Sequence, residues 1–307
     1  MTQLEKAPRV GRTALWWRAL VAAPVMLGGL AVVVLVAGPL GAWAPVVPLA
    51  WLALAGVWLT RSGERVAVRI AYRYRRLNTE QAGQLRAAFA VAESRTKIVM
   101  SEVDVYVRAG TGNSINAYAA GRRSIAVSEG AIAAAADGRL TTPQVGALVA
   151  HELGHLQSRG TRYGLAIAWL GAPWRAVVAV LGGMLRLIVG KVPTARAGLV
   201  VLGPIVVAVA VVQGVQQHAW VPLAAMVTVG VLLIVQPLAA AALSRSGERA
   251  ADAYAVQCGL GPELAGALQA FEQAAGGGRA WASHPPRERR IRELTAAAAG
   301  HQLTDAC

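Results

Sequence analysis

The stretch His151-Glu152-Leu153-Gly154-His155 is the feature from which the fold and the chemistry of this chain follow. It has the pattern H-E-x-x-H, so on a helix its two histidines lie on one face, one turn apart. Two imidazoles in this position can bind one zinc ion, and Glu152 between them can take a proton from a bound water molecule. The alternative is two ordinary helix histidines beside a solvated glutamate.

The neighbouring residues predict the helix that this motif needs. Thr142 is placed to cap its start, Pro143 suits its first turn, and Gly160 is placed to end it. The apolar residues interleaved with the histidines form one face of this helix and are Val145, Leu148, Val149, Leu153 and Leu156.

The composition indicates a membrane protein. Hydrophobic residues make up 55% of the 307 residues, and the mean hydropathy of +0.46 is too high for an ordinary soluble enzyme. The formal net charge of +14 lies beside apolar stretches, which favours a lipid bilayer as partner and no nucleic acid. Cys258 and Cys307 provide neither a disulfide framework nor a Cys-x-x-Cys metal site.

The N-terminal part predicts a transmembrane hairpin. Residues 19–60 carry no charge, which suits two crossings of about 20 residues joined by a turn at 38–41. A cleavable signal peptide is the alternative for the first apolar run, and the second run argues against it. The segments on both sides, 1–18 and 61–76, are basic, so the positive-inside rule places both in the cytoplasm.

An arginine-rich run follows the hairpin. Arg61, Arg65, Arg69 and Arg73 are spaced by four and would form one basic stripe on a helix, and a further pair of arginines follows them. We interpret this run as a solvated helix face, or one that rests on anionic lipid, rather than as a nucleic-acid site.

A small sheet is predicted before the H-E-x-x-H helix. After a helix over 79–95, capped by Asn78 or Thr79, alternating or β-rich segments predict strands at 102–108, 115–119 and 124–128. An edge strand beside a zinc site can hold an extended peptide by main-chain hydrogen bonds.

The second half contains another long apolar region. Residues 197–244 carry no charge and have a polar break at 213–218, which predicts crossings at about 198–213 and 220–243. Residues 163–190 are also apolar but include Arg175 and Arg186. They are either interfacial or a further span, and the cost of a charge in the bilayer favours the interfacial alternative.

Three residues near the C-terminus are candidates for the same site. Glu248 and Asp252 share a helix face, and Glu248 would complete a His₂Glu zinc set. Asp252 is placed to accept the ring N–H of a zinc-bound histidine, although both acids could also be a solvated pair. His284 precedes two prolines and could approach the zinc or the reacting carbonyl, or could cap the helix that follows.

In this order the motifs resemble the HtpX-like membrane zinc metalloproteases, relatives of the CAAX prenyl endopeptidases. The resemblance extends from about residue 77 to 292 and rests on four elements: His151 to His155, Glu248-x-x-x-Asp252, Asn116-Ala117-Tyr118-Ala119, and His284-Pro285 with Arg290. The chain is too short for the many spans of the prenyl proteases, so prenyl-protein processing is disfavoured.

The resemblance implies a role for each of these residues. It implies one zinc ion per chain, with the ligands His151, His155 and Glu248 and the catalytic residue Glu152. Asp252 matches the aspartate that supports a zinc-bound histidine. His284 matches a histidine that stabilises the oxyanion or occupies the open zinc position. Arg290 matches the arginine that accompanies this histidine. The strand formed by Asn116, Ala117, Tyr118 and Ala119 matches the segment that lines the substrate cleft.

We therefore predict a mainly α fold: a multi-pass helical membrane protein with a zincin-like α+β metalloprotease domain that carries a small β-sheet. The first hairpin is predicted at 1–60 and the protease part with the sheet at 61–160. The second apolar region is predicted at 161–243 and the segment with the third ligand at 244–307.

The predicted activity is that of a gluzincin-type zinc endopeptidase in the cell membrane, with its site facing the cytoplasm. The resemblance implies polypeptide substrates, in particular misfolded membrane proteins, and thus protein quality control. One alternative is an inactive membrane scaffold or regulatory pseudoprotease, against which the intact Glu152 argues. Another is a transporter, but neither uncharged stretch contains the intramembrane carboxylate that a driven carrier usually needs.

Overall fold

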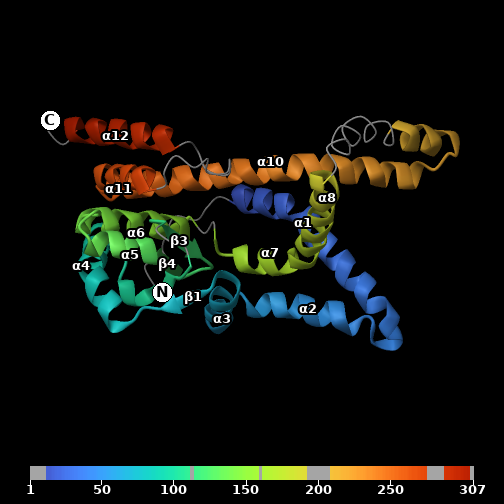
Figure 1. Cartoon of the computed structure of the whole chain (residues 1–307), viewed down its shortest axis with the longest axis horizontal. Coiled ribbons are helices and arrows are strands. Elements are labelled where there is room, and N and C mark those ends of the chain that lie inside the picture. The colour runs from blue at the N-terminus through green and yellow to red at the C-terminus, as the bar shows by residue number, and fades with distance from the viewer. Residues whose placement is uncertain (1–11, 111–113, 159–160, 192–207, 275–286, 305–307) are drawn as a thin grey trace. The chain divides into compact units, whose positions relative to one another are not determined.

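A computed structural model describes residues 12–110, 114–158, 161–191, 208–274 and 287–304 (Figure 1). The chain divides into two compact units. Unit 1 contains Met1–Arg18, Leu52–Ala168 and Ala241–Cys307, and unit 2 contains Ala19–Trp51 and Trp169–Ala240. The fold is mainly helical with a small mixed sheet, as the sequence predicts.

Long apolar helices make up unit 2. Helix α1 (Arg12–Ala37) continues into a 3-10 helix, η2 (Gly38–Trp43), and the segment Trp16–Trp43 is apolar and long enough to cross a membrane. In this unit α1 approaches α8 (Ala172–Lys191) closely, because a Cβ added at Gly28 would lie 2.8 Å from the indole ring of Trp174. Small residues at such crossings are typical of helices packed in membranes.

The other predicted crossings stay predictions. Helix α2 (Val46–Val57) is too short to span by itself and is bent by 102° from α3 (Arg61–Tyr72). Likewise α7 (Gly164–Leu170) is bent by 57° from the described part of α8, Ala172–Leu187. The crossing predicted at 198–213 falls largely outside the described residues, and that at 220–243 lies within α10 (Trp220–Gln257).

A four-stranded sheet forms the base of unit 1, in the order β1-β2-β4-β3. The predicted strands are present as β2 (Asp104–Arg108), β3 (Ala117–Ala120) and β4 (Ser124–Ser128). The pair β2–β4 is parallel, and the pairs β1–β2 and β3–β4 are antiparallel. Strand β3 therefore lies at one edge of the sheet, as the substrate-strand prediction requires.

The fourth strand, β1 (Tyr74–Arg76), corrects the interpretation of the arginine-rich run. Arg73 is not part of the basic helix, because α3 ends at Tyr72 and Arg73 takes a left-handed conformation with φ of 56°. Arg75 and Arg76 then pair with β2. A segment of three residues that includes two arginines has no alternating pattern, so the sequence does not predict this strand. Its pairing with β2 defines it.

Helices cover this sheet and complete the core of unit 1 (Figure 1). Helix α6 packs against α4, α11 and β3, and α11 packs against α12. Their side chains meet in a core that contains Leu85, Val145, Leu264 and Leu294, all at most 3% exposed. The bounds of these helices are Thr79–Thr96 for α4, Glu129–Ala136 for α5, Thr142–Gln157 for α6, Gly261–Ala274 for α11 and Arg287–Thr304 for α12.

Helix α6 begins one residue earlier than its predicted cap implies. Thr141, not Thr142, is the N-cap residue, and its hydroxyl accepts a hydrogen bond from the Gln144 backbone N–H at 3.4 Å. The Gln144 side chain accepts in return from the Thr141 N–H at 2.8 Å, which makes a capping box. The helix ends at Gln157, and Gly160 lies outside the described residues.

Candidate metal centre

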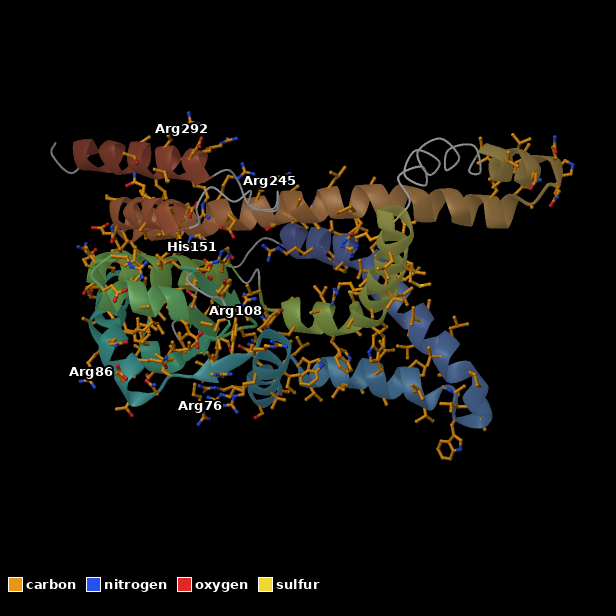
Figure 2. The ribbon with its side chains drawn as sticks, viewed as in Figure 1. Arg76, Arg86, Arg108, His151, Arg245 and Arg292 are labelled. Carbon is orange, nitrogen blue, oxygen red and sulfur yellow. The ribbon has the colours of Figure 1, made fainter. Side chains whose placement is uncertain are left out.

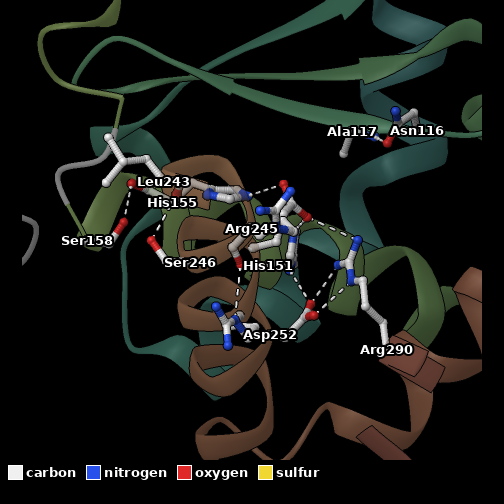
Figure 3. Close-up of polar contacts among 12 residues, drawn as sticks. Asn116, Ala117, His151, His155, Ser158, Leu243, Arg245, Ser246, Asp252 and Arg290 are labelled. Atoms are coloured by element: carbon white, nitrogen blue, oxygen red, sulfur yellow. Dashed lines mark hydrogen bonds and ion pairs between the residues drawn. The ribbon is translucent and has the colours of Figure 1, made fainter. Parts of the chain in front are cut away.

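Two segments of unit 1 that are distant in the sequence bring together three side chains that could hold a metal ion. Helix α6 contributes His151 and His155, and the C-terminal part of α10 contributes Glu248. One ligand atom from each lies within 4.8 Å of the other two. The spacing of the two histidines, which Figure 3 shows side by side, predicts that they share one face, and the fold adds the glutamate predicted as third ligand.

The distances within this group fit a shared divalent ion. Nε2 of His151 lies 3.6 Å from Glu248 Oε2, and Nε2 of His155 lies 3.5 Å from Glu248 Oε1. Two ligand atoms bound tetrahedrally to one zinc ion are about 3.3 Å apart, given metal–ligand distances near 2.05 Å. The imidazole rings are nearly perpendicular, at 87°, with centroids 4.8 Å apart. The donor set and its spacing therefore fit zinc.

A second layer of contacts holds the ligands in place. Nδ1 of His151 lies 3.0 Å from Asp252 Oδ1, which leaves Nε2 directed to the ligand group. Arg290 of α12 donates two hydrogen bonds to the Asp252 carboxylate, at 2.8 and 2.6 Å, and its Nη1 lies 3.0 Å from Glu248 Oε2. Arg290 thus connects both carboxylates of α10, and Figure 3 shows its guanidinium beside Asp252.

Charges are concentrated in this buried site. His151, Glu152, Glu248, Asp252 and Arg290 are each between 5% and 8% exposed. Burial alone would lower the pKa of His151, but its contacts with Asp252 and Glu248 raise it to about 9. Burial alone would raise the pKa of Glu248. The two histidines and Arg290 instead keep this pKa well below its usual range. A proton on His151 and a metal ion would compete for the same nitrogen.

A sequence model of peptidase family M48 matches residues 79–298, which include every residue of the group described above. The chain belongs to peptidase family M48. This confirms the resemblance to the HtpX-like proteases, and it implies a metallopeptidase that acts on polypeptides. The comparison with curated proteins found no match.

Gly154 explains how α6 and α10 of this M48 peptidase come close enough to share ligands. A Cβ added at Gly154 would lie 3.0 Å from the Cα of Ala251 and 3.1 Å from the Cβ of Tyr254. Glycine therefore lets the two backbones meet beside the histidines. Residue 154 is one of the two unspecified positions of the H-E-x-x-H pattern, so the motif does not predict this role. The glycine at that position was the signal in the sequence that could have indicated close helix packing.

The edge strand β3 lies against α6, which carries the histidines. Ser128 N–H donates to the Asn116 carbonyl at 2.8 Å, and this fixes the register of β3 on β4. The backbone groups of Ala117 and Ala119 consequently face the free edge. Asn116 Oδ1 accepts from the Ala117 N–H at 3.0 Å. Tyr118 stacks its ring under the Arg108 guanidinium, 4.3 Å from the ring centroid.

The structure places most of the predicted site residues. It brings together the proposed ligand group, Glu152, Asp252 and Arg290. Residues Ala117 to Ala119 lie on the edge strand β3, and Asn116 directly precedes that strand. His284 lies outside the described residues. Arg290, which only the family resemblance suggested, contacts both Asp252 and Glu248.

Proposed function

We propose that this M48 peptidase is a membrane-bound, zinc-dependent endopeptidase that hydrolyses peptide bonds of membrane or misfolded proteins at the cytoplasmic face. The observation that carries the proposal is the group His151, His155 and Glu248, whose ligand atoms lie within 4.8 Å of one another in a buried site. Two histidines and one glutamate are a common ligand set of catalytic zinc, and they leave a position for water and substrate.

Each side chain of the site has a proposed task. Zinc bound by His151, His155 and Glu248 would supply Lewis-acid activation of the scissile carbonyl and of water. Glu152 takes the proton of the attacking water and delivers it to the leaving amine. Asp252 fixes the His151 tautomer through the 3.0 Å contact. His284, outside the described residues, is assigned to the oxyanion, where one donor typically contributes about 3 kcal/mol.

The edge of the sheet supports an extended polypeptide as the substrate. The free edge of β3 carries the backbone groups of Ala117 and Ala119, and the strand packs against the helix that bears the histidines. A substrate segment that adds to this edge as a further strand is held by its main chain, so binding depends weakly on sequence. Weak sequence dependence suits an enzyme that removes misfolded proteins.

The membrane location is supported by the apolar segment Trp16–Trp43. The basic N-terminal segment and the arginine-rich run after residue 60 favour the cytoplasm for both ends of the first hairpin. Cysteines engineered at 40, 160, 216 and 246 test this orientation by labelling from each side of the membrane. Positions 160 and 246 should share the cytoplasmic compartment, and labelling from opposite sides would contradict one common site.

A combined metal and cleavage assay tests the activity. We expect the purified protein to contain one zinc ion per chain and to cleave an unfolded casein-type substrate. The variant Glu152→Ala should keep its zinc and its fold but lose cleavage by about 10²- to 10⁴-fold. Cleavage at the wild-type rate in this variant would refute the mechanism. A wild-type protein that binds zinc and cleaves nothing would instead favour the pseudoprotease scaffold.

A further inference from the structure

Helix α3 has an inner face that is fixed to the sheet of unit 1. Glu64 is only 4% exposed, and its carboxylate accepts hydrogen bonds from the Arg122 and Arg123 backbone N–H groups at 2.9 and 3.0 Å and from the Ser124 hydroxyl at 2.7 Å. Arg122 and Arg123 lie in the turn between β3 and β4, and Ser124 is the first residue of β4. Val68 on the same face is fully buried. One side of α3 is therefore committed to the fold.

The opposite side combines apolar and basic residues. Ile70 is 73% and Val66 45% exposed, and the exposed residues Arg69 and Arg73 follow Val66 and Ile70 by three positions each. The exposed arginines of β1 extend this surface, and Figure 2 shows Arg76 pointing outward from the strand. We call these residues the α3 surface: Val66, Arg69, Ile70, Arg73, Arg75 and Arg76.

The arginines of this surface differ from the two at the start of α3. Arg61 and Arg65 both contact Asp104, at 3.5 and 2.7 Å, so their charge is balanced within the fold. Within the described ranges, no ion pair joins the four arginines of the α3 surface to an acidic side chain. This surface therefore carries uncompensated positive charge around two exposed aliphatic side chains.

We propose that the α3 surface binds anionic lipid headgroups at the membrane–water interface. Aliphatic side chains between arginines suit this zone, because the apolar groups enter the acyl boundary while the guanidinium groups reach phosphate. The bend of 102° after α2 is what a chain needs to turn from a crossing direction into the membrane plane. A nucleic acid would match the charge but leave Ile70 and Val66 without an apolar partner.

This proposal rests on the membrane location included in the proposed function, and it adds a consequence. Glu64 joins α3 to the turn that follows β3, so lipid contact on one side of the helix holds the predicted substrate strand at a fixed distance from the bilayer. The edge of the sheet would then receive polypeptide that emerges at the membrane surface.

Fluorescence quenching in vesicles tests the proposal. The full chain, with Cys258 and Cys307 replaced by alanine, carries one bimane-labelled cysteine at Ile70→Cys, Leu35→Cys in the apolar N-terminal helix, or Ala296→Cys on α12. Figure 2 shows Arg292 of α12 on the side of unit 1 opposite Arg76. Each protein is reconstituted into phosphatidylcholine vesicles with or without 30% phosphatidylglycerol, and a fraction of the lipid carries a nitroxide near the headgroup.

We expect the label at 70 to be quenched when phosphatidylglycerol is present, and the label at 296 to remain unquenched. Arg69→Gln, Arg75→Gln and Arg76→Gln together should reverse the quenching, because each basic residue near an anionic surface contributes roughly a five-fold factor in binding. The matched control changes three exposed arginines elsewhere, Arg86→Gln, Arg139→Gln and Arg292→Gln, and should leave it unchanged.

The outcomes separate this proposal from the proposed function. If the label at 35 is quenched and that at 70 is not, lipid binding by the α3 surface is refuted while the membrane location stands. If neither is quenched, the membrane location fails, and this proposal fails with it. Equal quenching at 70 without phosphatidylglycerol would refute the selectivity for anionic lipid. RNA binding by the detergent-solubilised protein that the α3 variant loses would refute lipid as the partner.

Discussion

Two buried glutamates of unit 1, Glu64 and Glu248, show what separates a structural carboxylate from a candidate metal ligand. They are 4% and 8% exposed, so burial does not distinguish them. Glu64 has three short hydrogen bonds from two peptide N–H groups and a serine hydroxyl, at 2.7 to 3.0 Å. Glu248 faces two imidazole nitrogens at 3.5 and 3.6 Å, which is too far for a good hydrogen bond.

The partners of the two carboxylates explain their different capacities. Peptide N–H groups cannot turn toward a metal, so a cation near Glu64 would find donors where it needs ligands. The imidazoles around Glu248 offer lone pairs once they are deprotonated. The site also holds three buried carboxylates, Glu152, Glu248 and Asp252, against one permanent cation, Arg290, and a divalent ion balances that excess.

The largest expected effect is on metal content. Glu248→Ala removes one of three proposed ligands, so we expect zinc affinity to fall by more than about 100-fold, beyond the effect of losing a supporting contact. Glu64→Gln, a change to an equally buried carboxylate, should leave zinc stoichiometry unchanged. Metal analysis after dialysis against a weak chelator measures both. Full zinc occupancy in Glu248→Ala would show that Glu248 is not a ligand.

The second effect is on stability, where we expect Glu64 rather than Glu248 to matter more. Glu64→Ala leaves two partly buried N–H groups and a buried hydroxyl without their acceptor, and we expect it to lower the free energy of unfolding by about 3 kcal/mol. Thermal unfolding in detergent should show a melting temperature lower by roughly 5 to 10 °C. Glu80→Ala, at an exposed position of α4, is the control. An unchanged melting temperature for Glu64→Ala would contradict the tie between α3 and the sheet.

A smaller effect is expected from the residue that orients His151. Asp252→Ala removes the acceptor at 3.0 Å from His151 Nδ1 and should lower zinc affinity about 10- to 100-fold. Asp137→Ala, which breaks the exposed pair with Arg139 at 3.1 Å, should not alter it. Competition with a fluorescent chelator gives both affinities, and equal values for the two variants would exclude a role for Asp252 in ligand orientation.

The smallest effect concerns the close approach of α6 and α10. Gly154→Ala places a methyl group 3.0 Å from Ala251 Cα, and such overpacking should cost about 1 kcal/mol and weaken zinc binding a few-fold. Gly83→Ala, in open space on α4, should be neutral or stabilising by up to about 1 kcal/mol. Thermal unfolding and zinc titration of both variants decide this, and a neutral Gly154→Ala would show that the helices can separate without loss.

Local patterns in the sequence were sufficient for most of unit 1. The spacing of His151 and His155, the alternation in residues 102–108 and the helix over 79–95 follow from periods of 3.6 and 2, which are properties of neighbouring residues. The match to family M48 confirms the resemblance that these motifs suggested. The roles of the ligands and of Glu152 stay predictions that the substitutions above test.

Tertiary structure decided what depends on partners far away in the chain. The sequence contained β1, Arg65 with Asp104, and Glu64 with the turn at 121–124, but no local pattern revealed them, because each owes its place to a segment at least 30 or so residues distant. The same holds for Arg290, which meets Glu248 only where α12 approaches α10. Periodicity determines which side of an element is buried, and packing determines which elements meet there.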